Sequence, residues 1–123
     1  MATIDITSQT FEETIEKNDI VIIDFWAEWC GPCKSFSPIY EDVSKKYEDI
    51  VFGKIDTETE QELAGHFQIR SIPTLMIFRE QVVLFSQAGM LSAQQLEEVI
   101  GKIKEIDMAK VHEEIASQEK ENS

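Results

Sequence analysis

The chain has 123 residues, which fits one domain, and carries a formal net charge of −13 at pH 7. Its 42% hydrophobic and 28% charged residues supply a core and exclude an intrinsically disordered chain. Residues 1–101 hold 18 acidic and 7 basic side chains, so the acidity belongs to the globular part and disfavours nucleic acid as a partner.

No apolar run approaches the length of about 20 residues that a membrane span requires, so no membrane partner is expected. Residues 1–11 lack a basic segment followed by an apolar stretch, which argues against a signal peptide. We therefore expect a cytoplasmic location. In that reducing compartment a cysteine pair is more often catalytic or metal-binding than structural.

Strands and helices are predicted to alternate through the first half of the chain. Residues 3–6 form a weak strand candidate, and Thr10-x-x-Glu13 is a capping-box pattern that begins a short helix. The segment Ile20–Trp26 is nearly continuous in apolar and β-branched residues. That composition is typical of a strand covered on both faces, as in a parallel sheet.

A longer helix is predicted over residues 32–47, because its apolar side chains keep helical spacing: Phe36, Ile39, Tyr40, Val43 and Tyr47. Residues 51–55 read as a second buried strand, and residues 59–67 as a short helix. Residues 74–78 and 82–88 are predicted to pair as an antiparallel hairpin. Its turn, Glu80-Gln81, lacks the glycine or asparagine that two-residue hairpins prefer, which puts the turn geometry in doubt.

Ser92 is expected to cap the last regular helix, whose inner face carries Leu96, Val99, Ile100 and Ile103. Beyond residue 105, Asp107 is placed to cap a further helix with an apolar stripe of Met108, Val111 and Ile115. This extension is read either as a helix that packs weakly or frays, or as a docking helix for a partner. Its apolar stripe is expected to pack on the domain or on a second copy. The domain is therefore expected over residues 1–105 and the extension over 106–123.

The predicted order β-α-β-α-β-α-β-β-α implies an α/β fold. The alternating first half favours parallel strands with right-handed crossovers, and the hairpin adds antiparallel strands at one side. We therefore expect a central mixed five-stranded sheet flanked by helices.

The two cysteines of the chain lie within Trp-Cys-Gly-Pro-Cys-Lys, residues 29–34. Cys30 is predicted just after the strand Ile20–Trp26 and at the start of the next helix. The positive end of the helix dipole favours the thiolate of Cys30 there. Pro32 suits a first helical turn, and Cys33, further along the helix, is expected to be the more shielded thiol.

Three interpretations of the pair are open. A structural disulfide would close a very short loop and stabilise the fold little. A zinc site needs two more ligands, and the histidines, His66 and His112, are not at the spacing of a compact finger. Because a strand precedes the motif and a helix follows it, we favour redox function, with no metal bound.

The segment Asp24-Phe-Trp-Ala-Glu-Trp-Cys-Gly-Pro-Cys-Lys34 resembles the active site of the thioredoxin family. Lys54-x-Asp56, then Ile69-Arg-Ser-Ile-Pro-Thr74, then Gly89 follow in the family's order and at matching spacing. The resemblance covers residues 3–105 and implies the thioredoxin fold.

The resemblance assigns roles to residues outside the motif. It implies that Asp24 is buried behind the cysteines, handles the proton of Cys33 through water and has Lys54 as its charge partner. Burial is then expected to raise the pKa of Asp24, an effect that Lys54 partly offsets. It also implies a cis bond between Ile72 and Pro73, which faces the disulfide. The implied docking surface for clients consists of Trp29, Gly31, Pro32, Ile72, Pro73 and Gly89.

The function implied is that of a thioredoxin-type protein disulfide reductase, which contributes to electron transport and cell redox homeostasis. Cys30 attacks a client disulfide, and Cys33 then resolves the mixed disulfide, leaving a Cys30–Cys33 bond. No bound cofactor is expected. The resemblance implies that NADPH recharges the chain through thioredoxin reductase, and that the partners of a monomeric chain are this reductase and disulfide-containing clients.

Two alternatives remain beside this interpretation. The chain could be an oxidase or isomerase of the same fold, although Gly-Pro between the cysteines resembles the reducing members. It could instead be a non-catalytic partner subunit that docks through the thioredoxin surface and the extension. The sequence departs from the family pattern in its hairpin turn and in running about 18 residues past the usual end.

Overall fold

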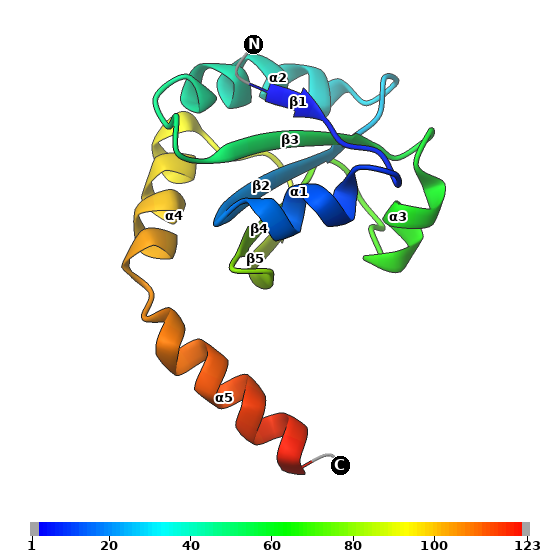
Figure 1. Cartoon of the computed structure of the whole chain (residues 1–123). Helices are drawn as coiled ribbons and strands as arrows, with labels where there is room; N and C mark the ends of the chain where they lie inside the picture. Colours follow the sequence, from blue (N-terminus) through cyan, green and yellow to red (C-terminus); the bar gives the residue numbers. More distant parts are fainter. Residues whose placement is uncertain (1–2, 122–123) are drawn as a thin grey trace.

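A five-stranded mixed sheet lies at the centre of the structure, a computed structural model that describes residues 3–121 (Figure 1). The strand order is β1-β3-β2-β4-β5. Neighbours β1, β3 and β2 run parallel, whereas β4 is antiparallel to both β2 and β5. The strands are β1 (Thr3–Asp5), β2 (Ile20–Trp26), β3 (Val51–Asp56), β4 (Thr74–Arg79) and β5 (Val82–Ala88). The expected α/β fold with a mixed sheet is confirmed.

Strand β2 lies in the middle of the sheet, and its first six residues are buried. Its alternate side chains enter two different cores. Ile20 and Ile22 pack with α2 (Gly31–Ser44) and α4 (Ala93–Glu105), whereas Val21 and Ile23 pack with α1 (Phe11–Lys17) and the neighbourhood of α3 (Gln61–His66). This two-sided burial is why the strand is apolar almost throughout.

Local hydrogen bonds remove the expected cap of one predicted helix and change the ends of two others. The capping box expected at Thr10 is absent, because the Thr10 hydroxyl accepts from the backbone N–H of Thr7 instead. Helix α3 begins only at Gln61, since the Asp56 carboxylate ties the N–H groups of residues 58 and 59 into a turn. Helix α2 ends at Ser44, where tighter bonds such as that from the N–H of Tyr47 to the Ser44 carbonyl replace the helical pattern.

The β4–β5 hairpin closes with the two-residue turn Glu80-Gln81, despite the absence of glycine or asparagine. Glu80 has φ 50° and Gln81 has φ 70°, so both occupy the left-handed region that such a turn requires. For side chains with a Cβ this conformation is unfavourable, by about 1 kcal/mol or more per residue. The turn is therefore a tight two-residue connection with strained backbone at both residues.

Helix α4 starts with the expected cap at Ser92, which forms a capping box with Gln95. At its other end, Nη1 of Arg79 donates to three backbone carbonyls, those of Ile103 (2.9 Å), Lys104 (3.3 Å) and Ile106 (3.1 Å). A cation at a helix C-terminus satisfies carbonyls that have no partner within the helix. Arg79 thereby fixes the point at which the chain leaves the domain.

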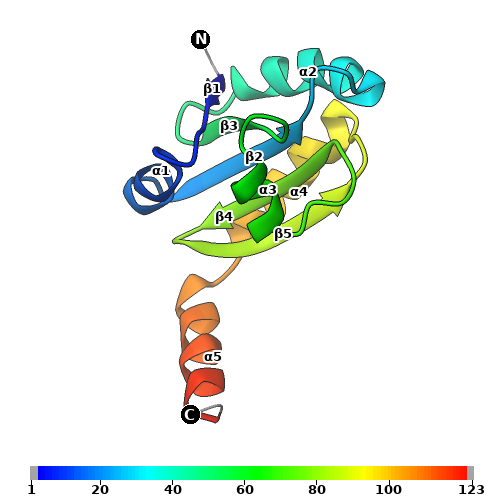
Figure 2. The ribbon, with the colours of Figure 1, turned by 90° about the vertical axis from the view of Figure 1, so that its right-hand side faces the viewer.

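The extension forms a regular helix, α5 (Met108–Glu121), that projects away from the sheet (Figures 1 and 2). The Asp107 carboxylate accepts from the N–H of Lys110, as expected of a cap. Met108 is buried, Val111 and Ile115 are half-buried, and Nε2 of His112 lies 2.9 Å from Oε1 of Glu80. Its first turns thus rest on the β4–β5 hairpin.

Across residues 3–121, helices are all too short or too polar to cross a membrane.

Candidate active site

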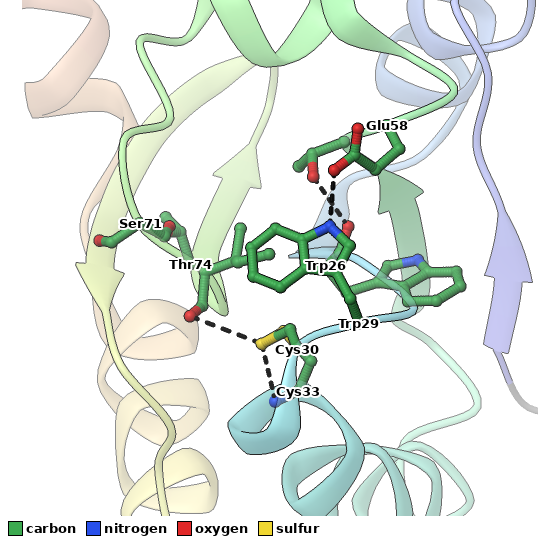
Figure 3. The surroundings of a disulfide bond; sticks show 9 residues. Trp26, Trp29, Cys30, Cys33, Glu58, Ser71 and Thr74 are labelled. Atoms are coloured by element: carbon green, nitrogen blue, oxygen red, sulfur yellow. Dashed lines mark hydrogen bonds between the residues drawn. A yellow bond between two sulfur atoms is a disulfide. The ribbon is translucent and has the colours of Figure 1, made fainter.

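The cysteine pair lies where β2 ends and α2 begins (Figure 3). The N–H of Cys30 donates to the carbonyl of Ala27 over 3.2 Å, which turns the chain sharply after the strand. Cys30 is the N-cap of α2, and its Sγ accepts from the N–H of Cys33 over 3.1 Å. The two sulfurs form a disulfide. The predicted strand-to-helix position is therefore confirmed.

Both cysteines are buried, with exposed fractions of 4% for Cys30 and 3% for Cys33. Cys33 was expected to be the more shielded thiol, and its exposed fraction is the lower of the two by a small margin. Ala27 shares their cluster, and Trp26 and Ile72 pack against it, so Cys30 is covered from outside its own helix. The two thiols therefore differ in position along the helix far more than in exposure.

A loop from the neighbouring strand faces the pair. The Ile72–Pro73 bond is cis, as expected, and the Ile72 carbonyl oxygen lies 3.7 Å from Sγ of Cys30. The N–H of Gly89 donates to the Pro73 carbonyl over 2.8 Å, and Gly89 has φ 96°, which favours glycine. The loop before β4 and the end of β5 are thus held together opposite Cys30.

The residues expected to form a docking surface differ in exposure. Trp29 is 69% exposed, and Gly31, Pro32 and Gly89 are exposed as well. Ile72 is half-buried and Pro73 is buried. These two residues can therefore contact a client through their backbone and part of the Ile72 side chain, and neither projects as Trp29 does.

The sequence reasoning missed two residues next to members of this expected surface, Glu58 and Met90. Nε1 of Trp29 donates to Oε1 of Glu58 over 2.6 Å, which orients the exposed indole ring (Figure 3). Met90, next to Gly89, is 42% exposed. A large apolar residue directly after a loop glycine was the available signal for Met90, whereas the partner of Trp29 lies 29 positions away.

Asp24 is fully buried in β2, with an exposed fraction of 0%. Neither of its carboxyl oxygens has a hydrogen-bond partner among residues 3–121. Burial raises the pKa of Asp24 from 3.8 to about 7, and the positive charge of Lys54 opposes that rise. The expected burial and raised pKa are confirmed, and the carboxyl is divided between its charged and neutral forms near neutral pH.

Lys54 pairs with Asp24 in the register of β2 and β3, as the resemblance implied. Its ammonium is nevertheless engaged elsewhere. Nζ donates to Oγ of Ser37 over 3.3 Å and lies 4.9 Å from the centroid of the Trp26 ring. Ser37 was missed by the sequence reasoning, although its position four residues after Cys33, on the same helical face, was a signal.

A cavity of about 110 Å³ lies between Cys33 and this lysine. Its lining consists of Trp26, Ala27, Glu28, Cys33, Lys34, Ser37 and Lys54. The lining is partly polar and the volume is sufficient for water molecules. Cys33 and Lys54, the register partner of Asp24, thus border one space that water can enter.

The two histidines lie outside the site. His112 pairs with Glu80 at the hairpin turn, and the ring of His66 packs edge-on against Phe67. Within residues 3–121, no three histidine, cysteine or acidic side chains are grouped closely enough to hold a metal ion.

Comparison with known proteins shows similarity along nearly the whole chain. Residues 2–118 match the Thioredoxin family model. The chain is 50% identical over 118 residues to putative thioredoxin 2 of Streptomyces coelicolor, covering 96% of this chain and 88% of the relative. It is 39% identical over 99 residues to thioredoxin of Buchnera aphidicola subsp. Acyrthosiphon pisum, covering 79% and 92%.

A solved structure, that of a mutant thioredoxin from Halobacterium salinarum NRC-1, superposes with a TM-score of 0.78 at 29% identity, covering 86% of this chain and 95% of that one. The matches to the family model and to the Streptomyces protein both extend past residue 105 into α5. That part of the chain is therefore shared with at least one relative.

Proposed function

The chain belongs to the thioredoxin family, and on that premise we propose a role for each residue around its disulfide. The family and the Cys30–Cys33 pair make it a thiol–disulfide oxidoreductase that reduces protein disulfides. The observation that carries the assignment of roles is the placement of Sγ of Cys30 at the N-terminus of α2.

Cys30 is the attacking thiol. In the reduced protein, its sulfur would lie at the positive end of the α2 dipole, where the N–H of Cys33 donates to it, and both effects favour the thiolate. The thiolate attacks one sulfur of the client disulfide, and a bond forms between Cys30 and that sulfur. The other client sulfur leaves as a thiolate and takes a proton from solvent.

Cys33 is the resolving thiol, and Asp24 accepts its proton. A pKa of about 7 lets the Asp24 carboxylate take a proton near neutral pH and release it afterwards. Water in the cavity beside Cys33 and Lys54 provides the route. The Cys33 thiolate then attacks Sγ of Cys30, the mixed disulfide breaks, and the second client sulfur leaves. In all, two electrons pass to the client and the chain ends as the disulfide.

Clients dock across the exposed side chains around the pair. Trp29 offers a large apolar ring, and Gly31, Pro32 and Gly89 leave room for a client backbone to approach. The Ile72 backbone, close to Cys30, is placed to pair with an extended client segment beside Pro73.

The cellular setting is part of the proposal. Disulfide-containing proteins are the clients, and thioredoxin reductase returns electrons from NADPH, so that the chain takes part in electron transport and redox homeostasis in the cytoplasm. The chain acts as a monomer and holds no cofactor. The family assignment and the redox pair support this proposed setting.

The extension is proposed to be an appendage of the catalytic domain, with residues 1–105 as the thioredoxin domain and 106–123 as the extension. It contacts the hairpin end of the sheet through His112, which pairs with Glu80, and its Met108 is buried. Truncation after residue 106 should therefore leave disulfide reduction intact. A lost or slowed reaction would make the extension part of the catalytic unit.

The roles of the two cysteines can be separated with single serine variants, assayed as reduction of insulin by dithiothreitol. Cys30→Ser should abolish the stimulated rate, because the attacking thiol is lost and only the resolving thiol of Cys33 remains. Cys33→Ser should form a covalent adduct with a client and stall there. Equal adduct formation by both variants, or an adduct only with Cys30→Ser, would overturn the assignment.

A further inference from the structure

Asp24 and Lys54 are oppositely charged register partners on neighbouring strands, yet the Asp24 carboxyl and the Lys54 ammonium do not hydrogen-bond. A buried carboxylate normally recruits the nearest cation, because an unpaired buried charge is costly. Here both carboxyl oxygens remain without a hydrogen-bond partner in the described part of the chain. The arrangement needs something that holds the ammonium elsewhere.

Two groups hold it. Oγ of Ser37 accepts from Nζ of Lys54 over 3.3 Å, and the face of the Trp26 ring lies 4.9 Å from the same nitrogen. A hydroxyl acceptor and an aromatic face both stabilise an ammonium group. Together they compete with the Asp24 carboxyl for the same cation.

Ser37 occupies a position suited to this task. It is half-buried on α2, four residues after Cys33, and both line the cavity together with Lys54. The next serine of the helix toward its start, Ser35, is exposed instead. One hydroxyl on α2 therefore reaches the lysine from the same face that presents the resolving cysteine.

We propose that Ser37 is a positioning residue whose hydroxyl, together with the Trp26 ring, holds the Lys54 ammonium off the Asp24 carboxyl and keeps both carboxyl oxygens available for proton exchange with Cys33. The proposal rests on the proposed function of Asp24 as the proton acceptor of Cys33.

The physical consequence concerns the basicity of the carboxyl. A cation in direct contact with a carboxylate lowers its pKa by about 1–3 units. Burial places the pKa of Asp24 at about 7 with Lys54 held at its present distance. A direct ion pair would pull that pKa below neutrality, and a weaker base would accept the Cys33 proton less readily.

Other charged and titratable groups surround Asp24 and Lys54. Helix α2 contributes Cys33, Lys34 and Tyr40, the segment before it contributes Glu28, and β3 contributes Lys54. Strand β4 places the apolar Leu75 opposite Asp24. Among these groups it is Lys54 that opposes the effect of burial on Asp24, so a shift that follows Ser37 should pass through Lys54.

The test is a carboxyl titration of Asp24 by carbon-13 NMR in the full-length, reduced protein labelled at aspartate. Ser37→Ala should lower the pKa of Asp24 by about one unit or more, since the freed ammonium can then reach the carboxyl. Ser37→Thr keeps the hydroxyl and should leave the pKa unchanged. Ser35→Ala is the matched control on the same helix and should also have no effect.

The double variant Ser37→Ala, Lys54→Met identifies the route. Its Asp24 pKa should equal that of Lys54→Met alone, because Ser37 has nothing to hold once the ammonium is gone. An unchanged or raised pKa in Ser37→Ala, or an equal fall with and without Lys54, would overturn the proposal.

The pH dependence of the resolving step separates this proposal from the role given to Asp24. In the plot of resolving rate against pH, one inflection should report the ionisation of Asp24. Ser37→Ala should shift this limb of the profile to lower pH, by the same amount as in the titration, and Asp24→Asn should remove it. A profile unchanged in Asp24→Asn would show that Asp24 is not the acceptor. A limb lost in Asp24→Asn but unmoved in Ser37→Ala would refute the role of Ser37 alone.

Discussion

Asp24 and Arg79 are charged residues toward opposite ends of the β2–β4 pair, and the fold treats them differently. Asp24, in register with Leu75, is fully buried, and its carboxyl makes no hydrogen bond within the described chain. Arg79, in register with Ile20, is 18% exposed at its side chain and donates to three carbonyls from Nη1 alone. Its Nε also lies 3.8 Å from the Asp19 carboxylate.

The difference separates a structural charge from a reactive one. Arg79 satisfies carbonyls that α4 leaves unpaired, so its hydrogen bonds fix the junction between α4 and α5. The Asp24 carboxyl is left without such partners, which destabilises its charged form and brings its pKa to about 7. A group held in that way can change its protonation state at physiological pH, at the expense of stability.

Asp24→Asn should produce the largest change in stability. The folded-state pKa of Asp24 is raised from 3.8 to about 7, so stability is fully present below pH 3.8 and falls as the pH rises to about 7. A shift of about three units corresponds to about 4 kcal/mol. Relative to the native chain, the free energy of unfolding of the variant should therefore gain up to about 4 kcal/mol between pH 3 and pH 8.

Urea denaturation of the oxidised protein measures this, since disulfide-bonded cysteines do not titrate. The exposed Asp5 provides the control, because Asp5→Asn removes a surface carboxyl from β1 and should give no comparable gain. If the free energies of unfolding of Asp24→Asn and of the native chain differ by the same amount at every pH, the folded-state pKa of Asp24 is not raised. The contrast between Asp24 and Arg79 would then fail.

Arg79→Met should have an intermediate effect of the opposite sign. Net contributions of hydrogen bonds from a charged donor are about 1.5–3 kcal/mol, so losing those to the carbonyls of Ile103, Lys104 and Ile106 should destabilise the fold by about 2 kcal/mol. Thermal denaturation measures the loss, with Arg70→Met as the exposed control. The rate of disulfide reduction should not change, and a slowed rate would show that the hairpin end acts on the site.

Gln81→Gly should give the smallest change, and it tests whether the hairpin end is fully relaxed. Gln81 has φ 70°, a conformation that glycine adopts without steric strain, so the substitution should stabilise the fold by up to about 1 kcal/mol. Gln87→Gly, an exposed position in regular β5, should destabilise it instead. If both glycines destabilise equally, the turn carries no strain.

Patterns of apolar residues predicted the fold well where burial decides the structure. The bounds of β2 agree with the expected segment Ile20–Trp26, because a strand buried on both faces has a composition that few other elements share. Helix ends were predicted less well. The N–H of Thr7 takes the hydroxyl that was expected to cap α1, and the Asp56 carboxylate delays the start of α3. Such local competition does not show in apolar spacing.

The candidate site divides in the same way. The cysteine spacing and the strand before it predicted where the disulfide would lie, and the resemblance supplied Asp24, Lys54 and the cis Ile72–Pro73 bond. Ser37 and Glu58 escaped prediction, because each acts on a residue 17 or 29 positions away. Their side chains are of types that are common on any surface, so composition carried no signal.

The chain alone thus specified a mixed sheet, a redox pair at the start of a helix and a carboxyl behind it, since burial and chain connectivity are written in residue type and order. The state of that carboxyl was decided only in three dimensions. Burial in the sheet raises the pKa of Asp24 to about 7, while Ser37 and the Trp26 ring engage the nearest cation. Hydrogen-bond competition of this kind depends on distances that no linear pattern contains.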